Sequence, residues 1–325
     1  MTGKLLLRSL GWMLLILGGT GVLVLGTFRL VPATHALNVW TLAASTFIPW
    51  LWIPALAACA GLALMLHRRW RWIAAAVTVV TLALMAWPLV PLDADRPSPG
   101  SPELTVLSAN VLYGNAEVSE VSALITEDVD VLAFQEYTPA FAAQLKAAGV
   151  LEEFPHQVGT ADESAAGSML LSRTPLAMVA RARGTVFENL VASTEVDGMT
   201  WHIAAIHTAP PTMGGPRWEH DGAAVAEMLA QFAGEHLVAV GDYNAIAQHS
   251  ILREMTDDGM VRDLAGPHTG ALRWHPTWPT GGMIPPFARI DNALVSHSVV
   301  GPVPEYHQIL GSDHAALRVT VGPRE

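Results

Sequence analysis

The chain has 325 residues, of which 51% are hydrophobic and 14% charged, and its formal net charge is −11 at pH 7. The charge is unevenly divided: residues 1–90 contain no Asp or Glu, whereas residues 97–325 contain 27 of them against 11 Lys and Arg. This acidity disfavours a duplex nucleic acid as partner, because binding to a phosphate backbone is driven by basic side chains.

Three long apolar stretches lie within residues 1–90, at Leu10–Phe28, Trp40–Leu66 and Trp72–Val90. Each is about as long as a membrane-spanning helix needs to be, roughly 20 residues. Buried helices of a soluble domain would need polar faces that these stretches lack, and a cleavable signal peptide would explain only the first. The sequence therefore predicts three transmembrane helices in residues 1–90, with Pro49 and Pro54 kinking the second.

The basic residues predict the orientation of these helices. Lys4 and Arg8 precede the first stretch, and "HRRWR" at 67–71 lies between the second and the third. The third is followed by "PLDADRPSPG", which is acidic. Because cytoplasmic loops carry an excess of Lys and Arg, we expect a multi-pass protein of the cell membrane with a cytoplasmic N-terminus and an extracytoplasmic chain after Val90.

Residues 91–102, with four prolines, are typical of a linker, and residues 103–325 are long enough for one sizeable domain. In this domain the sequence predicts strands at 103–111, 129–136 and 167–176, and helices at 117–130, 138–149 and 216–233. Asp197–Gly198 lies between two alternating runs and indicates a hairpin. The apolar run in "HLVAVGDYNA", 236–245, predicts a further buried strand.

Several of these predicted strands end in polar side chains that can bind a metal or move a proton. Two amides, four carboxylates and two histidines lie at such ends: Asn110, Glu136, His207, Asp242, Asn244, Asp291, Asp313 and His314. For Asp242 and Asn244 a simple turn is an alternative, since Asp and Asn side chains bond their own backbone after a strand. Loop ends on a rigid sheet are nevertheless where sites are normally built.

The chemistry of these side chains favours a hard cation. Carboxylate and amide oxygens suit Mg²⁺, with Mn²⁺ as an alternative, and histidines can exchange protons near neutral pH. A zinc hydrolase is disfavoured, because the chain has no H-E-x-x-H segment and only one cysteine, Cys59.

Six short segments in order resemble the endonuclease/exonuclease/phosphatase superfamily. They are "SAN" at 108–110, "FQE" at 134–136, "IHTAPP" at 206–211, "GDYNA" at 241–245, "RID" at 289–291 and "SDH" at 312–314. The resemblance implies a DNase I-like α+β fold, a four-layer αββα sandwich with two mostly antiparallel sheets, at 103–325. Together with the three apolar stretches, it is also similar in layout to the membrane-anchored VanJ-type branch.

The resemblance also implies roles for the residues at the strand ends. Glu136 would be the principal metal ligand, with Asn110 beside it, and Asp313 would assist at the metal.

The remaining five residues would be catalytic. Asp242 and Asn244 would position the attacking water or the phosphate. His314 would be the base or a phosphate contact, oriented by Asp291, and His207 a second phosphate contact or the acid.

Two positions depart from the pattern of the superfamily, Asn292 where an aromatic is commoner and Ala316 where proline is frequent. The long basic DNA-gripping loops of the nuclease members are also missing. We therefore expect a membrane-anchored, Mg²⁺-dependent phosphoesterase that hydrolyses a phosphodiester, pyrophosphate or phosphomonoester of a lipid or lipid-linked substrate. An extracellular nuclease and a catalytically inactive membrane protein of this fold are the alternatives.

Overall fold

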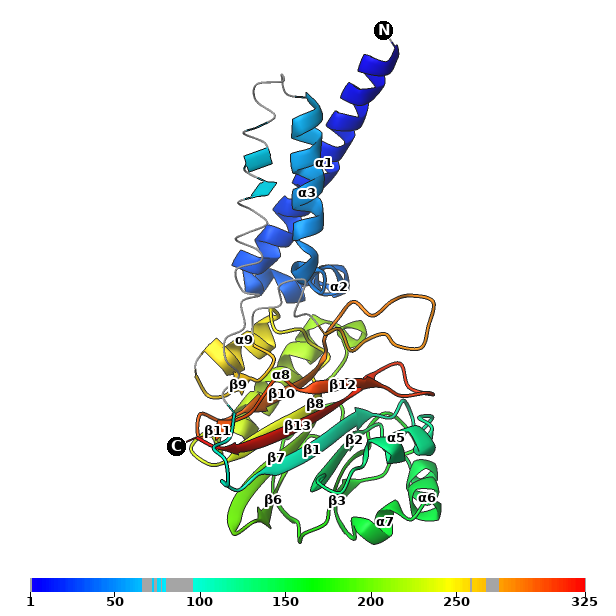
Figure 1. The fold of residues 1–325 in the computed structure, drawn as a ribbon, viewed down its shortest axis with the longest axis vertical. Helices are drawn as coiled ribbons and strands as arrows, with labels where there is room; N and C mark the ends of the chain where they lie inside the picture. The colour runs from blue at the N-terminus through cyan, green and yellow to red at the C-terminus, as the bar shows by residue number, and fades with distance from the viewer. Residues whose placement is uncertain are drawn as a thin grey trace. The chain divides into compact units, whose positions relative to one another are not determined.

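The computed structural model describes residues 2–65, 72, 75–76, 78–79, 96–257, 259–266 and 275–324. The chain divides into two compact units. The helical unit contains the N-terminal helices, and the sandwich unit contains the described residues from Arg96 on (Figure 1).

The helical unit consists of α1 (Thr2–Leu30), η1 (Pro32–Leu37), α2 (Val39–Ser45), η2 (Ile48–Trp50) and α3 (Trp52–Met65). Two segments, Leu5–Leu30 and Ile48–Met65, are long and apolar enough to cross a membrane, which is compatible with membrane anchoring. The first lies over the predicted span Leu10–Phe28. The third predicted span, Trp72–Val90, lies largely outside the described residues.

The prediction of one helix over Trp40–Leu66 is wrong. The backbone leaves the α-helical path after Ser45 and resumes it at Trp52, with the 3₁₀ turn of Pro49 between them. Proline lacks an amide hydrogen and clashes with the preceding turn, so it cannot lie inside a helix without disrupting it. Pro54 is tolerated because it lies in the first turn of α3.

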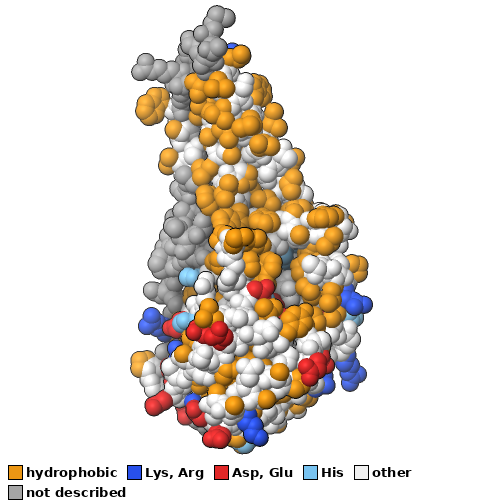
Figure 2. Space-filling model, turned by 90° about the vertical axis from the view of Figure 1, so that its right-hand side faces the viewer, with side chains coloured by type: hydrophobic (Ala, Val, Ile, Leu, Met, Phe, Trp, Pro, Cys, Tyr) orange, Lys and Arg blue, Asp and Glu red, His pale blue; other side chains and the backbone are white. Residues whose placement is uncertain are grey.

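Glycines allow α1 and α3 to approach each other closely. A Cβ at Gly18 would lie 2.4 Å from the amide nitrogen of Ala58, and one at Gly61 would lie 2.5 Å from that of Leu15. Close approach through small residues is typical of helices that associate in membranes. On the face shown in Figure 2, hydrophobic side chains cover these helices and nearly all charged side chains belong to the sandwich unit.

The first sheet of the sandwich unit has seven strands in the order β11–β13–β1–β2–β4–β3, with β12 also paired to β13. The strands are β1 (Leu104–Asn110), β2 (Val131–Gln135), β3 (His156–Thr160), β4 (Ser168–Ser172), β11 (Val299–Val300), β12 (Glu305–Gln308) and β13 (Ala315–Pro323). Only β1 and β2 are parallel neighbours.

The second sheet has six strands in the order β5–β6–β7–β8–β10–β9. They are β5 (Ala177–Arg181), β6 (Leu190–Val196), β7 (Met199–His207), β8 (Leu237–Asp242), β9 (Arg262–Asp263) and β10 (Asp291–Val295). Here only β7 and β8 are parallel. The predicted hairpin is present, since Val196 pairs with Met199 across Asp197–Gly198, both of which have positive φ.

The two sheets pack face to face through a buried apolar core to which Val106 and Val131 contribute from one sheet and Ile203 and Val240 from the other. Three helices cover the outer face of the first sheet: α5 (Val118–Leu124), α6 (Pro139–Ala147) and α7 (Val150–Glu153). Two lie over the second: α8 (Gly215–Ala230) and α9 (Ser250–Asp257) (Figure 1). The architecture is therefore the expected DNase I-like sandwich, although its sheets are mixed. Helix α5 is shorter than the predicted 117–130 because the chain leaves the helix at Ile125.

Candidate active site

Each parallel strand pair ends in polar residues. Asn110 and Gln135 are partners at the ends of β1 and β2, with Glu136 the next residue, and His207 and Asp242 are partners at the ends of β7 and β8. Parallel neighbours bring their carboxyl ends to the same edge of a sheet. The structure thus places side chains from both sheets around one position.

Asp242 is the centre of this cluster and is buried. Its Oδ2 accepts hydrogen bonds from Nδ2 of Asn110 at 3.2 Å and from Nδ2 of Asn244 at 3.3 Å. The same oxygen lies 3.7 Å from Nε2 of His207 and 3.7 Å from Nε2 of His314. Four of the predicted site residues therefore surround one carboxylate oxygen.

Asp242 and Asn244 form a turn and also belong to the candidate site, so the two interpretations of this pair are both correct. Oδ1 of Asp242 accepts the backbone N–H of Asn244 at 2.8 Å, as in an Asx turn, and Asn244 adopts φ of 46°. A positive φ is uncommon for a residue other than glycine and clusters at functional sites. The turn holds the amide of Asn244 against Asp242.

Glu136 follows β2 and also has a positive φ, 58°. Its Oε1 accepts Nδ2 of Asn110 at 3.1 Å, and its Oε2 accepts the backbone N–H of Tyr113 at 2.8 Å. Burial raises the pKa of the Glu136 carboxyl, although the hydrogen bonds from Asn110 and Tyr113 oppose the effect. Asn110 therefore connects the carboxylates of Glu136 and Asp242 through its amide nitrogen.

His314 lies directly before β13, and Ser312 Oγ accepts its backbone N–H at 3.0 Å. Its Nδ1 lies 3.0 Å from Oδ2 of Asp291, which begins β10 opposite Asp242. Burial alone would lower the pKa of His314, but the neighbouring carboxylates, Asp291 first, outweigh it and raise the pKa. With Nδ1 bonded to Asp291, only Nε2 of His314 is left to face Asp242 and Asp313.

His207 is buried and stacks on Phe187, with the ring centroids 4.1 Å apart. Asn189 fixes its backbone at both ends, accepting the His207 N–H at 2.7 Å and donating to its carbonyl at 2.9 Å. Burial lowers the pKa of His207 to about 3, with the nearby His314 contributing, so its ring is neutral near pH 7. The pKa values of the two histidines of the site are thus shifted in opposite directions, down for His207 and up for His314.

Asp313 is held by the loop that contains Thr277 and Trp278. Nε1 of Trp278 donates to Asp313 Oδ2 at 3.0 Å. Thr277 Oγ1 accepts the backbone N–H of Asp291 at 3.2 Å. These contacts, like those of Phe187 and Asn189 to His207, were missed because no pattern in the sequence links such distant positions.

The donor set fits a hard divalent cation. Asp242, Asp291 and His314 each offer a ligand atom, and these atoms lie within 4.8 Å of one another. Oδ1 of Asp313 is buried and accepts no hydrogen bond from the described residues; it lies 3.8 Å from Nε2 of His314. A buried oxygen without a donor is costly unless something compensates for it, and oxygen-rich sites with an imidazole suit Mg²⁺ or Mn²⁺.

The fold defines the class of protein, a DNase I-like sandwich with an acidic and histidine-containing cluster at the strand ends. Residues 107–314 match the Endonuclease/Exonuclease/phosphatase family, and the chain belongs to this family. Its members hydrolyse phosphoester bonds, often with a divalent metal. No curated protein matches the chain.

Solved structures of several proteins are similar to this chain. An endonuclease/exonuclease/phosphatase from Beutenbergia cavernae is 15% identical with a TM-score of 0.53, covering 68% of this chain and 72% of that one. A humanized D. rerio TDP2 is 16% identical with a TM-score of 0.51, covering 68% of this chain and 99% of that one. The 3'-5' exonuclease NExo from Neisseria meningitidis is 17% identical with a TM-score of 0.50, covering 66% of this chain and 98% of that one. At these identities the likeness shows the shared fold.

Proposed function

We propose that this protein is a membrane-anchored, extracytoplasmic, Mg²⁺-dependent phosphoesterase that acts on a lipid or lipid-linked phosphate, as in the VanJ-type branch of the family. One observation carries the proposal: a single oxygen of Asp242 lies in contact with Asn110 from the other sheet and with two histidines. Such convergence of buried carboxylates and imidazoles at strand ends supplies the groups that phosphoester hydrolysis needs.

Glu136, Asn110 and Asp313 would hold the cation, with the Asp242, Asp291 and His314 group as a second candidate set. When bound, the cation polarises the phosphoryl group and stabilises the charge on the leaving oxygen.

The residues of the chain perform the remaining tasks. Asp242, with Asn244 fixed beside it, accepts a proton from the attacking water as the new P–O bond forms. The leaving oxygen takes a proton from solvent as its own bond to phosphorus breaks, and Asp242 then releases its proton to solvent. Nε2 of His314 contacts a phosphoryl oxygen, because Nδ1 is engaged by Asp291. The neutral ring of His207, held against Phe187, makes a second phosphate contact.

The loops that carry the site support a lipid substrate. Of the seven exposed large hydrophobic residues in the described part of the sandwich unit, five lie a few residues from a site residue or from Trp278. We call these five the apolar rim: Tyr113, Met213, Met283, Ile284 and Leu310. Exposed apolar side chains on the loops that carry a site favour a membrane or an apolar ligand as its partner. The net acidity of residues 97–325 opposes DNA as substrate.

The purified full-length protein in detergent, assayed with Mg²⁺ and with EDTA, tests the proposal. The substrates are a polyprenyl phosphate, a polyprenyl pyrophosphate, sphingomyelin, inositol phosphates and double-stranded DNA. We expect metal-dependent release of phosphate or headgroup from at least one lipid. DNA cleaved faster than every lipid offered would establish the nuclease alternative, and no cleavage of any substrate would favour an inactive protein.

The location is tested by fusing alkaline phosphatase, which is active only outside the cytoplasm, after Glu325. The distribution of basic residues predicts an active fusion. A silent phosphatase fusion together with a fluorescent cytoplasmic reporter at the same point would overturn the topology.

A further inference from the structure

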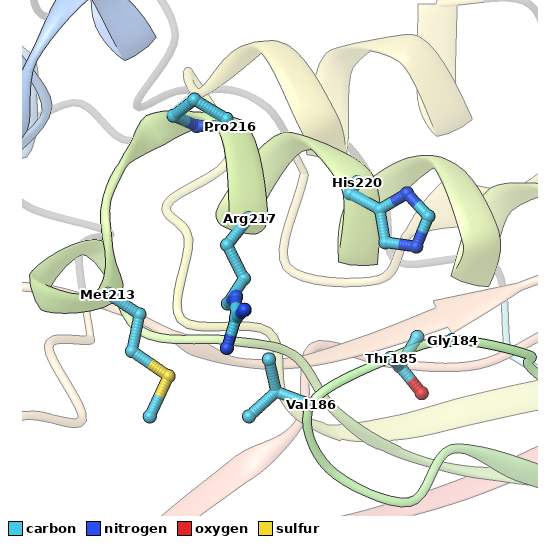
Figure 3. Close-up of a pocket in the computed structure, with 7 residues that line it drawn as sticks. All are labelled: Gly184, Thr185, Val186, Met213, Pro216, Arg217 and His220. Atoms are coloured by element: carbon cyan, nitrogen blue, oxygen red, sulfur yellow. The ribbon is translucent and has the colours of Figure 1, made fainter.

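A pocket of about 680 Å³ lies between α8 and the loop at 184–186. Figure 3 shows Arg217 extending from the first part of α8 between Met213 and Val186, and His220 directed from further along the helix toward Gly184 and Thr185. The pocket is much larger than a phosphate ion and combines polar and apolar walls.

Two connections join the loop that lines the pocket to the candidate active site. Val186 precedes Phe187, whose ring stacks on His207. The carboxylate of Asp221, next to His220 on α8, accepts the backbone N–H of Val186 at 3.1 Å and that of Ala209 at 2.9 Å. The pocket loop and the chain that follows His207 are therefore fastened to one buried carboxylate.

The charge of the pocket is opposite to that of its surroundings. Arg217, His220 and the hydroxyl of Thr185 lie on its walls, and no carboxylate is among the lining residues. Arg173, Arg181 and Arg318 each pair with an acidic side chain, whereas Arg217 forms no ion pair within the described part of the chain. The carboxylate of Asp221 acts electrostatically on Arg217 and His220, but its oxygens accept the backbone N–H groups of Val186 and Ala209. Two cationic side chains that face a pocket in a region with 27 acidic and 11 basic residues favour an anionic ligand there.

From this arrangement we infer that the pocket binds a second phosphate of the substrate, linked to the phosphate that is hydrolysed. The guanidinium of Arg217 matches the geometry of a phosphate bidentately, and His220 and Thr185 can donate further hydrogen bonds to it. Val186, Met213 and Pro216 contact the non-polar part of the same substrate. The inference rests on the proposed function and narrows it to substrates with two neighbouring phosphates, such as a pyrophosphate.

The test compares farnesyl diphosphate with farnesyl monophosphate, which have the same lipid and differ by one phosphate. Arg217→Gln should raise KM for the diphosphate about tenfold more than for the monophosphate, the loss expected for a charged hydrogen bond, with kcat little changed. Arg217→Lys should change KM for the diphosphate less than Arg217→Gln does, because lysine keeps the positive charge but cannot form the bidentate hydrogen bonds of a guanidinium. The control Lys146→Gln removes the same charge from α6 and should leave both substrates unaffected. An equal change in KM for the two substrates would overturn the inference.

A binding experiment separates this inference from the proposed function. Inorganic pyrophosphate is titrated calorimetrically into the full-length protein, its Arg217→Gln and His220→Gln variants and the Lys146→Gln control, with thermal unfolding checking that each is folded. Weaker binding by both pocket variants supports the subsite even if no phosphoester is hydrolysed, in which case the proposed function alone fails. If the enzyme is active but both variants bind pyrophosphate as the wild type does, the subsite is wrong and the function stands.

Discussion

Asn110 at the end of β1 donates a hydrogen bond to Asp242 at the end of β8, at 3.2 Å, and so joins the two sheets of the sandwich at the candidate active site. Its Oδ1 accepts the backbone N–H of Leu112 at 3.0 Å, which fixes the amide in this orientation. The two carboxylates that share the Asn110 amide, Glu136 and Asp242, are both buried and would repel each other without a donor between them.

Replacing Asn110 by alanine should therefore lower activity more than it lowers stability. Loss of one preorganised donor from an active site typically costs about 10²–10³-fold in rate. Steady-state kinetics on the lipid substrate found active would measure the effect, with Asn115→Ala on the neighbouring exposed loop as the control. Wild-type kcat in Asn110→Ala would show that the link between the sheets has no catalytic role.

Glu136→Gln should abolish metal-dependent hydrolysis and preserve the fold, because glutamine keeps the size of the side chain and removes its charge. The cost expected for losing a principal cation ligand is several kcal/mol of transition-state stabilisation. Activity is followed as Mg²⁺ is increased, alongside circular dichroism. Glu152→Gln, on the exposed side of α7, is the matched control. Full activity of Glu136→Gln at saturating Mg²⁺ would contradict the assignment.

Asp221→Ala should destabilise the sandwich unit, because it removes the acceptor of two backbone N–H groups, those of Val186 and Ala209. Each buried donor left unpaired costs about 1–3 kcal/mol. The free energy of unfolding, measured in urea, should fall by at least the cost of one such donor, whereas Glu219→Ala, exposed on the same helix, should leave it nearly unchanged. Equal stability of the two variants would show that the N–H groups find other acceptors.

Strands that lead into the site could be predicted along the chain, since each is a short apolar run that stops at a polar residue. Glu136 and Asp242 were found in this way. The prediction that a strand ends at Asp291 is wrong, because Asp291 is the first residue of β10 and reaches the site by pairing with Asp242 across antiparallel strands. The contacts between these residues were not predictable in detail, because they depend on the register of the two sheets. The two hydrogen bonds that Nδ2 of Asn110 donates illustrate this, since the acceptor Glu136 is 26 residues away in the sequence and the acceptor Asp242 is 132 residues away.

The N-terminal helices show a different limit of prediction from sequence. Hydropathy finds apolar segments but does not determine where a helix breaks, so Trp40–Leu66 was predicted as one helix although it contains Pro49. The capping of α2 by Asn38, whose Oδ1 accepts the N–H of Thr41 at 3.0 Å, is a local signal that could have revealed the start of a separate short helix.

Gly18→Val should weaken the packing of α1 on α3, because a Cβ at this position meets the backbone of Ala58 and of Pro54. Forcing side-chain atoms into a packed contact typically costs about 1–3 kcal/mol. The melting temperature of the detergent-solubilised protein should fall. Gly19→Val is a close control, since a Cβ there meets nothing within 4 Å. If both variants melt at the same temperature, the glycine contact does not stabilise the helix pair.

The last prediction concerns the apolar rim. Met283 is fully exposed and Ile284 is 63% exposed, on the loop that also carries Trp278, the hydrogen-bond donor to Asp313. If the substrate is a membrane lipid, these side chains enter the bilayer surface when the site engages a headgroup, and each buried apolar side chain contributes about 1.5–3 kcal/mol. The double variant Met283→Asp, Ile284→Asp should therefore reduce the rate on a vesicle-borne lipid phosphate by about tenfold or more. Its rate on a soluble short-chain analogue should be unchanged.

A matched control is available on the opposite edge of the second sheet. Met178 and Val179 on β5 are each 44% exposed and lie three strands away from β8 in the sheet order. Met178→Asp, Val179→Asp introduces the same charges on the same unit, so general repulsion from an anionic membrane would slow both double variants alike. A loss confined to the Met283–Ile284 variant and to vesicles identifies the rim as the membrane contact. Equal losses in the two variants, or an equal loss on the soluble analogue, would remove the support that the rim gives to a lipid substrate.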